Sequence, residues 1–134
     1  MKSPTHGRLL IKLAAIGPYL REKKSTKGHY FFDSLITCVN AKKSPESREF
    51  WGWWMVLELD NDAPLLIYGI GRYDADGQWI NEIPPENALA EVHQNLEHFQ
   101  VLLAKAMKEH FDMSLPEAFE ARSDQQPAFL ADQA

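Results

Sequence analysis

Histidine, cysteine and clustered carboxylates are the residues of this chain that could hold a metal ion or do covalent chemistry. The zinc-protease motif needs two histidines four positions apart on one helix, whereas His93 and His98 are five positions apart. A structural zinc site needs several thiolate or imidazole ligands, and Cys38 is the single cysteine. We therefore predict no metal site, no cofactor and no internal disulfide.

Three further patterns are similar to ligand-binding or catalytic motifs but lack essential residues. The Asp-Ala-Asp-Gly at 74–77 is similar to part of a calcium loop, yet alignment on its glycine places Arg72 and Ile83 where carboxylates are required. The Gly-Ile-Gly at 69–71 lacks the third glycine of a dinucleotide-binding turn. Cys38 lies in an apolar stretch without an obvious activating base, so we expect an inert thiol. These absences predict that the protein is not an enzyme.

Binding chemistry is concentrated in residues 48–59, Arg-Glu-Phe-Trp-Gly-Trp-Trp-Met-Val-Leu-Glu-Leu, which hold three of the four tryptophans. Aromatic and β-branched residues favour a strand, in which alternate side chains point to opposite faces. One face is expected to carry Phe50, Gly52, Trp54 and Val56, and the other Trp51, Trp53, Met55 and Leu57. Both faces need cover, one from the protein's own core and one from a second layer or a partner, and Trp and Arg often anchor partner interfaces.

Charge is distributed unevenly along the chain. The formal net charge of the 134 residues is −5, of which residues 1–48 carry +7 and residues 49–134 carry −12. This asymmetry is typical of a basic surface that binds something acidic, although solvated basic loops explain it equally well. The composition is that of one ordinary globular domain. No signal peptide or membrane span is predicted, because the apolar residues 9–16 are few and are interrupted by Lys12, so we expect a cytoplasmic protein.

Four strands and two helices are predicted to position the Trp-rich segment. The strands are expected at residues 29–41, 48–59, 65–73 and 78–83, with turns that contain Ser44-Pro45, Asp60–Pro64 and Asp76-Gly77. Consecutive strands joined by short turns pair antiparallel, so they form a four-stranded antiparallel meander. A short helix over Arg8–Ile16, ended by Gly17-Pro18, precedes a basic loop at residues 21–28 and the meander.

A long helix follows the meander and begins at Pro84-Pro85-Glu86. Apolar residues at alternating spacings of three and four form a stripe that can cover a sheet face. The stripe consists of Leu89, Val92, Leu96, Phe99, Leu103, Ala106 and His110, broadened by Leu102, Met107 and Phe111. Leu115-Pro116-Glu117 is interpreted as the start of one more short helix. The whole is an α+β domain over residues 1–121, with a disordered tail over residues 122–134.

Four segments of the chain occur in an order that is typical of one known family. They are Gly-Pro-Tyr-Leu-Arg-Glu at 17–22, Tyr-Phe-Phe-Asp at 30–33, Cys-Val-Asn at 38–40 and, above all, Arg-Glu-Phe-Trp-Gly-Trp-Trp-Met at 48–55. With them the chain resembles the Crl family, bacterial proteins that bind and activate the stationary-phase sigma factor. The resemblance implies binding to the second domain of that sigma factor and to the largest catalytic subunit of RNA polymerase. The resemblance thereby implies that the protein promotes assembly of sigma with the core enzyme and does not itself recognise a DNA sequence.

The resemblance also implies which residues contact the sigma factor. Tyr19, Arg48, Phe50 and Trp53 match the family's contact residues, and Pro18 and Asp33 are further candidates. A guanidinium can pair bidentately with a carboxylate of the partner, and aromatic side chains can fill the contact beside it. Because Phe50 and Trp53 have opposite strand parity, we expect either a bulge at Gly52 or a partner that wraps the end of the strand.

Two other functions stay open from the sequence. Aromatic residues on a sheet beside basic loops are typical of single-stranded nucleic-acid-binding modules, although the acidic overall charge disfavours this. A small-ligand pocket or an unrecognised enzyme built on the aromatic cluster would need an enclosed cavity with convergent polar groups. For the sigma-binding function we expect a monomer that contacts no membrane and no specific nucleic acid sequence.

Overall fold

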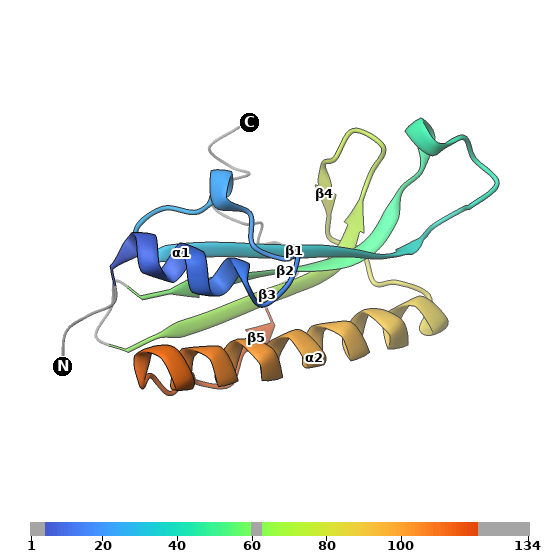
Figure 1. The fold of residues 1–134 in the computed structure, drawn as a ribbon. Coiled ribbons are helices and arrows are strands. Elements are labelled where there is room, and N and C mark those ends of the chain that lie inside the picture. The colour runs from blue at the N-terminus through green and yellow to red at the C-terminus, as the bar shows by residue number, and fades with distance from the viewer. Residues whose placement is uncertain (1–4, 60–62, 121–134) are drawn as a thin grey trace.

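The computed structural model describes residues 5–59 and 63–120, which form a curved sheet with two helices on one face (Figure 1). The strands lie side by side in the order β1-β2-β3-β4, and each neighbouring pair is antiparallel. The predicted α+β class and the four-stranded meander are therefore confirmed. No helix within the described ranges is long and apolar enough to cross a bilayer.

The Trp-rich segment forms the central strand of the sheet. The strands are β1 (His29–Cys38), β2 (Phe50–Glu58), β3 (Leu65–Tyr73) and β4 (Trp79–Ile80). Phe50 lies opposite Cys38 of β1 and Tyr73 of β3, so both hairpins are in register at this end of β2. The bounds of β3 are those predicted, whereas β4 is much shorter than predicted. Pro84 and Pro85 follow soon after it, and proline cannot donate to a strand ladder.

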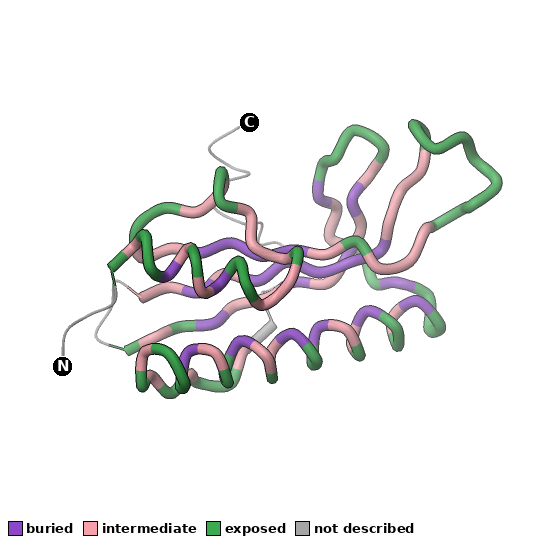
Figure 2. Tube along the Cα trace, viewed as in Figure 1, coloured by how far each residue is buried: buried purple, intermediate pink, exposed green. Residues whose placement is uncertain are grey.

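The two faces of β2 are buried by different partners, as the alternation in the sequence predicts. Trp51, Trp53, Met55 and Leu57 belong to the main core beneath the helices. Trp54 points to the opposite face and packs in a smaller cluster with Phe31, Tyr73 and Trp79. Figure 2 shows the result as an almost continuous buried stretch along the middle of the sheet.

A bulge interrupts the pairing of β1 with β2. The register shifts between Leu35 and Thr37, opposite Gly52. A side chain at Gly52 would collide with the backbone carbonyl of Ser34, so the close approach of the two strands requires glycine here. The irregularity expected at Gly52 therefore exists but lies in the neighbouring strand, and β2 pairs with β3 without a shift.

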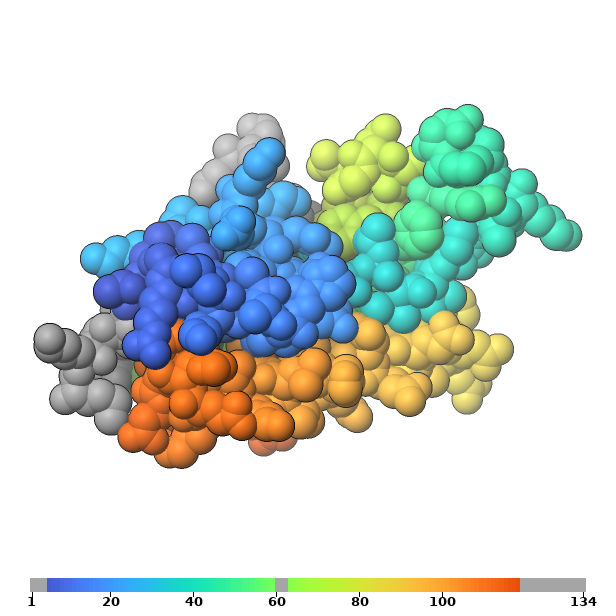
Figure 3. Space-filling model, viewed as in Figure 1, coloured from blue at the N-terminus to red at the C-terminus, as the bar shows by residue number. Residues whose placement is uncertain are grey.

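The N-terminal helix α1 (His6–Ala14) is capped by Thr5, whose side-chain oxygen accepts a hydrogen bond from the Arg8 amide at 3.2 Å. It lies two residues nearer the N-terminus than predicted, because Thr5 supplies the cap. Leu9 and Leu13 are its buried residues. Figure 3 shows α1 seated against the C-terminal part of α2. Two short 3₁₀ turns, η1 (Glu22–Lys24) and η2 (Pro45–Ser47), lie in the loops.

The long helix α2 (Glu86–Phe111) lies across the sheet as the apolar stripe predicts. Its buried residues are Ala88, Val92, Leu96, Phe99, Leu103 and Met107. The prediction differs at the last turns, where Met107 is buried while Ala106 is half-buried and His110 is exposed. An ideal helix has 3.6 residues per turn, so a step of four after Leu103 keeps Met107 on the buried face.

The short helix predicted at Leu115-Pro116-Glu117 is wrong. The chain leaves α2 through Asp112, whose φ of 51° is left-handed, and residues 112–118 are irregular. A two-residue strand β5 (Phe119–Glu120) then pairs parallel with Ile67 and Tyr68 of β3. The left-handed cap reverses the chain and brings it back to the sheet. The turn predicted at Asp60–Pro64 falls partly outside the described residues, and the tail predicted at 122–134 falls wholly outside them.

Candidate partner-binding site

A surface cleft of about 430 Å³ lies at the end of the sheet where β2 begins. Its lining comes from the basic loop (Arg21, Lys24), from β1 (Asp33, Leu35), from the segment that leads into β2 (Pro45, Glu46, Arg48, Phe50) and from the β3–β4 hairpin (Tyr73, Asp74, Ala75, Gly77). In Figure 1 the η2 loop and the β3–β4 hairpin project side by side from this end. Segments far apart in sequence thus converge on one surface.

The floor of the cleft is the carboxylate of Asp33, which is only 7% exposed. Arg21 Nε donates to its Oδ1 at 2.5 Å, and the hydroxyl of Tyr73 donates to its Oδ2 at 2.8 Å. A buried carboxylate is tolerated only when it is paired and hydrogen-bonded. Asp33 therefore joins the basic loop, β1 and β3 into one unit. The negative charge of Asp33 is paired with Arg21 inside the protein. Asp33 therefore holds the surrounding segments together and exposes little surface.

The hydroxyl of Tyr73 is held in its protonated form. Burial raises its pKa above the ordinary value of a tyrosine, and the Asp33 carboxylate raises it further. The charge of Arg21 acts in the opposite direction and is the smallest of these effects. Because the group stays neutral far above pH 7, it remains a hydrogen-bond donor to Asp33 under all physiological conditions.

Arg48 stands at the rim of the cleft, directly before β2. Its Nε donates to the carbonyl of Lys43 and its Nη2 to the carbonyl of Ala41, each at 3.0 Å. These two bonds close the loop that precedes β2. A guanidinium has five N–H donors, so it can shape this loop and still present charge to a partner. The half-buried position of Arg48 fits both roles.

Phe50 and Leu35 supply the apolar part of the cleft. Phe50 is half-buried, and Leu35 is 51% exposed, which is unusual for a large apolar side chain in a strand. The charged lining is mixed, with three basic residues (Arg21, Lys24, Arg48) and three acidic residues (Asp33, Glu46, Asp74). An apolar wall beside mixed charge suits a protein segment that brings both charged and apolar side chains.

Pro18 and Tyr19 lie outside this cleft, on the side of the sheet that carries the helices. The Tyr19 ring packs at 5.8 Å from the ring of Trp53 and at 5.0 Å from that of Phe99. Pro18 is exposed and Tyr19 is half-buried, so both reach the surface. The backbone connects them to the cleft, because the Asp33 amide donates to the Tyr19 carbonyl at 3.0 Å.

Trp53 departs from the expected surface position. Its side chain is 0% exposed, its ring stacks on Phe99 at 4.9 Å, and its Nε1 donates to Asn95 Oδ1 at 2.9 Å. The reason is strand parity, which places Trp53 on the helix side and Phe50 at the cleft. Trp53 supports Tyr19 from beneath and presents no surface of its own.

The sequence predicted only Asp33, Arg48 and Phe50 among the twelve residues that line the cleft. The nine that it missed include Arg21 and Tyr73, which both bond Asp33. Arg21 lies within the 17–22 segment that is typical of the family, but nothing in the sequence marked it as a cleft residue. Its pairing with Asp33 depends on how the basic loop folds over β1.

The position of Tyr73 opposite Phe50 could have been predicted by counting residues back from the β2–β3 turn. That turn spans about six residues, however, and a long turn leaves the register open.

These features define a class of protein: a small α+β binding module whose main core lies on one face of the sheet and whose open cleft lies on the other. The three clustered tryptophans are buried. They therefore offer no stacking surface to the bases of a single-stranded nucleic acid. The cleft is open and not an enclosed ligand cavity, and its rim and wall are suited to a protein surface.

Comparison with known proteins agrees with this class. Residues 1–125 match the family model described as sigma factor-binding transcriptional regulator Crl. The chain is 48% identical over 113 residues to the sigma factor-binding protein Crl of Vibrio vulnificus (strain YJ016), covering 84% of this chain and 88% of the relative. It is 49% identical over 114 residues to that of Vibrio cholerae serotype O1 (strain ATCC 39541 / Classical Ogawa 395 / O395), covering 85% and 88%.

A third relative, the sigma factor-binding protein Crl of Photobacterium profundum, is 47% identical over 112 residues, with 84% of each chain covered. The chain therefore belongs to the Crl family of sigma factor-binding transcriptional regulators. Its partner class is a sigma factor and its role is regulation of transcription. This family is one of regulators and not of enzymes.

Proposed function

We propose that this protein binds the second domain of the stationary-phase sigma factor and promotes assembly of that factor with core RNA polymerase in the cytoplasm. It acts as a monomer and makes no sequence-specific contact with DNA. The observation that carries this proposal is the cleft, where Asp33 of β1 meets Arg48 and Phe50 from the start of β2. These are three of the six residues that match the sigma-contacting positions of the family.

The six residues divide into contacts and supports. Arg48 and Phe50 at the cleft, together with Pro18 and Tyr19 across the edge of β1, are the surface that the sigma domain touches. Asp33 and Trp53 hold this surface in place, since Asp33 anchors Tyr19 and Trp53 underlies its ring. The sigma domain wraps the edge of the sheet and reaches both sides.

Activation follows from thermodynamic linkage. A protein that binds the assembled holoenzyme more tightly than free sigma shifts the assembly equilibrium by that difference in affinity. A coupling free energy of about 1–3 kcal/mol changes the apparent affinity of sigma for the core about 5–150-fold. Such a change is enough to decide a competition between sigma factors for limited core enzyme.

The test is calorimetric titration of the protein into the purified stationary-phase sigma factor, with the housekeeping sigma factor as the matched control. We expect saturable binding to the former and none to the latter. Repeating the titration with the isolated second domain locates the contact. Equal affinity for both sigma factors, or binding to neither, would overturn the proposal. An oligonucleotide titration at two salt concentrations tests the competing function of nucleic-acid binding. The affinity of a protein for nucleic acid falls steeply as the salt concentration rises.

A further inference from the structure

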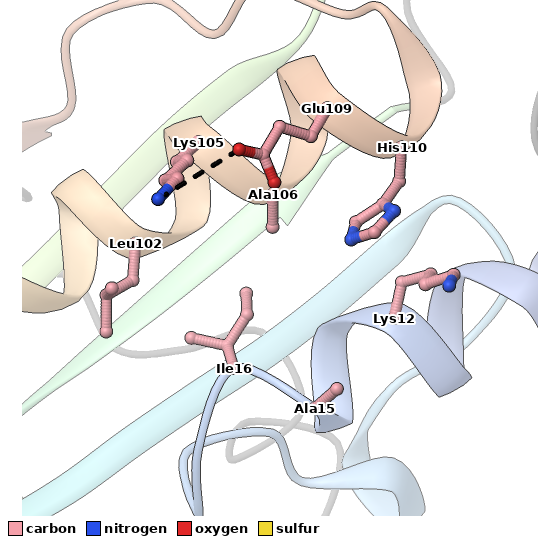
Figure 4. Close-up of a pocket in the computed structure, with 8 residues that line it drawn as sticks. All are labelled: Lys12, Ala15, Ile16, Leu102, Lys105, Ala106, Glu109 and His110. Carbon is pink, nitrogen blue, oxygen red and sulfur yellow. Dashed lines mark ion pairs between the residues drawn. The ribbon is translucent and has the colours of Figure 1, made fainter.

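A second groove runs between α1 and the C-terminal half of α2 (Figure 4). Its volume is about 240 Å³. None of its lining residues also lines the cleft, so the two are separate surfaces of the same domain. The residues that match the sigma-contacting positions of the family do not include any that line this groove.

The floor of the groove is apolar and lined by short side chains. Ile16, just beyond α1, points toward Leu102 and Ala106 of α2, and Ala15 lies beside it (Figure 4). Two alanines among the four apolar lining residues leave room for the side chains of another element. Two helices packed side by side leave a groove between them, into which the side-chain ridge of a third helix can fit.

Two lysines stand at the rim of the groove. Lys12 stands on the α1 side and Lys105 on the α2 side, where the imidazole of His110 also lines the groove. Glu109 is the one acidic residue of the lining, and its Oε1 lies 4.0 Å from Lys105 Nζ. Both of these side chains are more than half exposed, so their pairing is weak and leaves the lysine available.

Exposed apolar side chains flank the groove on each helix. Ile11 is 69% exposed and lies one turn before Ala15, and Val101 is 66% exposed and lies one turn before Lys105. Residues one turn apart are neighbours on a helix surface, so Ile11 lies beside Ala15 of the floor and Val101 lies beside Lys105 of the rim. Exposed apolar side chains next to a charged rim are typical of interaction surfaces.

We propose that the groove between α1 and α2 is a second docking site, which binds an acidic amphipathic helix of a partner protein. Apolar side chains spaced by three and four residues enter between Ile16, Leu102 and Ala106. Acidic side chains at the flanks of that helix pair with Lys12 and Lys105. The complementary charge selects an acidic segment, because a basic one would face these two lysines without compensation. The site acts independently of the sigma-binding cleft.

The probe is a pair of designed 16-residue amphipathic peptides with the same leucine pattern, one with glutamates and one with lysines on its polar face. Each is titrated into the ¹⁵N-labelled full chain and followed by amide chemical shifts. We expect the acidic peptide to bind at least tenfold more tightly than the basic one, with shifts centred on Ala15, Ile16, Leu102 and Ala106. Higher salt weakens the acidic complex, since charge pairs at the rim are screened.

The decisive variant is the double charge reversal Lys12→Glu with Lys105→Glu. We expect it to weaken the acidic peptide at least tenfold and to leave sigma binding unchanged. The matched control is Lys23→Glu with Lys27→Glu, which reverses two exposed charges outside both the groove and the cleft. Equal binding of the two peptides, or shifts centred on the cleft, would overturn the proposal. Concentration-dependent dimerisation through the groove would also overturn it, because the occupant would then be a second copy of the chain.

Discussion

The two faces of the sheet show how this domain separates stability from recognition. The helix-covered face holds a large continuous core, in which Trp53 is fully buried and its indole nitrogen is bonded to Asn95. The opposite face has a small aromatic cluster around Trp54, whose Nε1 is buried and has no hydrogen-bond partner within the described part of the chain. Beside that cluster the face opens into the cleft.

Adjacent tryptophans in one strand therefore have separate tasks, since Trp53 packs in the main core and Trp54 packs in the smaller cluster beside the cleft. A buried group that satisfies both packing and hydrogen bonding stabilises the fold. The cleft face, which leaves Trp54 Nε1 unpaired and Leu35 exposed, contributes less to the stability of the fold. Four substitutions test this contrast, and they are given in order of decreasing effect on stability.

Trp53→Ala tests the helix-covered face. It removes the largest fully buried side chain and leaves Asn95 without its donor, so we expect the free energy of unfolding to fall by about 3–5 kcal/mol. Chemical denaturation monitored by circular dichroism measures this loss. A variant that keeps its stability but loses sigma binding would show that Trp53 is a contact and not a support.

Gly69→Ala tests the opposite face. A Cβ at this position would lie 2.5 Å from Trp54 Nε1, so the indole must move. Overpacking of this kind costs about 1–3 kcal/mol of stability. We expect a perturbed near-ultraviolet spectrum and weakened sigma binding, because the displaced Trp54 disturbs the neighbouring Tyr73. Gly77→Ala is a weaker comparison within the same hairpin, since its positive φ disfavours alanine but no atom lies within 4 Å.

Tyr73→Phe removes the hydroxyl that donates to Asp33 and retains the aromatic ring. Loss of a buried hydrogen bond to a charged group costs about 1–3 kcal/mol. The raised pKa of Tyr73 adds a pH signature. Above about pH 10 the unfolded chain loses this proton while the folded chain keeps it, so stability is complete below that pH and falls above it.

Denaturation midpoints between pH 8 and 11 therefore separate the two proteins. The original protein should lose stability steeply above pH 10, and the Tyr73→Phe variant less steeply. Tyr30, whose pKa burial also raises, maintains part of the slope in both proteins. Identical slopes would mean that the Tyr73 hydroxyl is not buried against Asp33.

Arg48→Ala has the smallest expected effect on stability and the largest on binding. Its bonds to the Lys43 and Ala41 carbonyls are at an exposed rim, so we expect a loss of less than about 1 kcal/mol in the free energy of unfolding. Sigma affinity measured by calorimetry should fall at least tenfold. Lys43→Ala is the matched control, because it removes a nearby charge while keeping the carbonyl that Arg48 bonds. An Arg48→Ala protein that unfolds cooperatively and still binds sigma with the original affinity would contradict the assignment of Arg48 as a sigma contact.

Most of the fold could be predicted because it depends on local signals. Alternation along residues 50–58 places each side chain on its face, and the spacing of apolar residues locates α2. Prolines and glycines mark most of the turns. The failures are equally instructive: Leu115-Pro116 does not start a helix, because the left-handed residue Asp112 returns the chain to β3 as a parallel strand.

The candidate site was only partly predictable. The amino-acid sequence alone determined the type of chemistry, namely a guanidinium beside aromatic side chains, and the family to which that chemistry belongs. Only the tertiary structure decided which residues share a surface. The packing of α2 over one face of β2 buried Trp53, and the folded basic loop and the β2–β3 register brought Arg21 and Tyr73 onto Asp33. Side-chain direction is set by neighbours along the chain, whereas convergence at a cleft depends on contacts between distant segments, which local sequence does not encode.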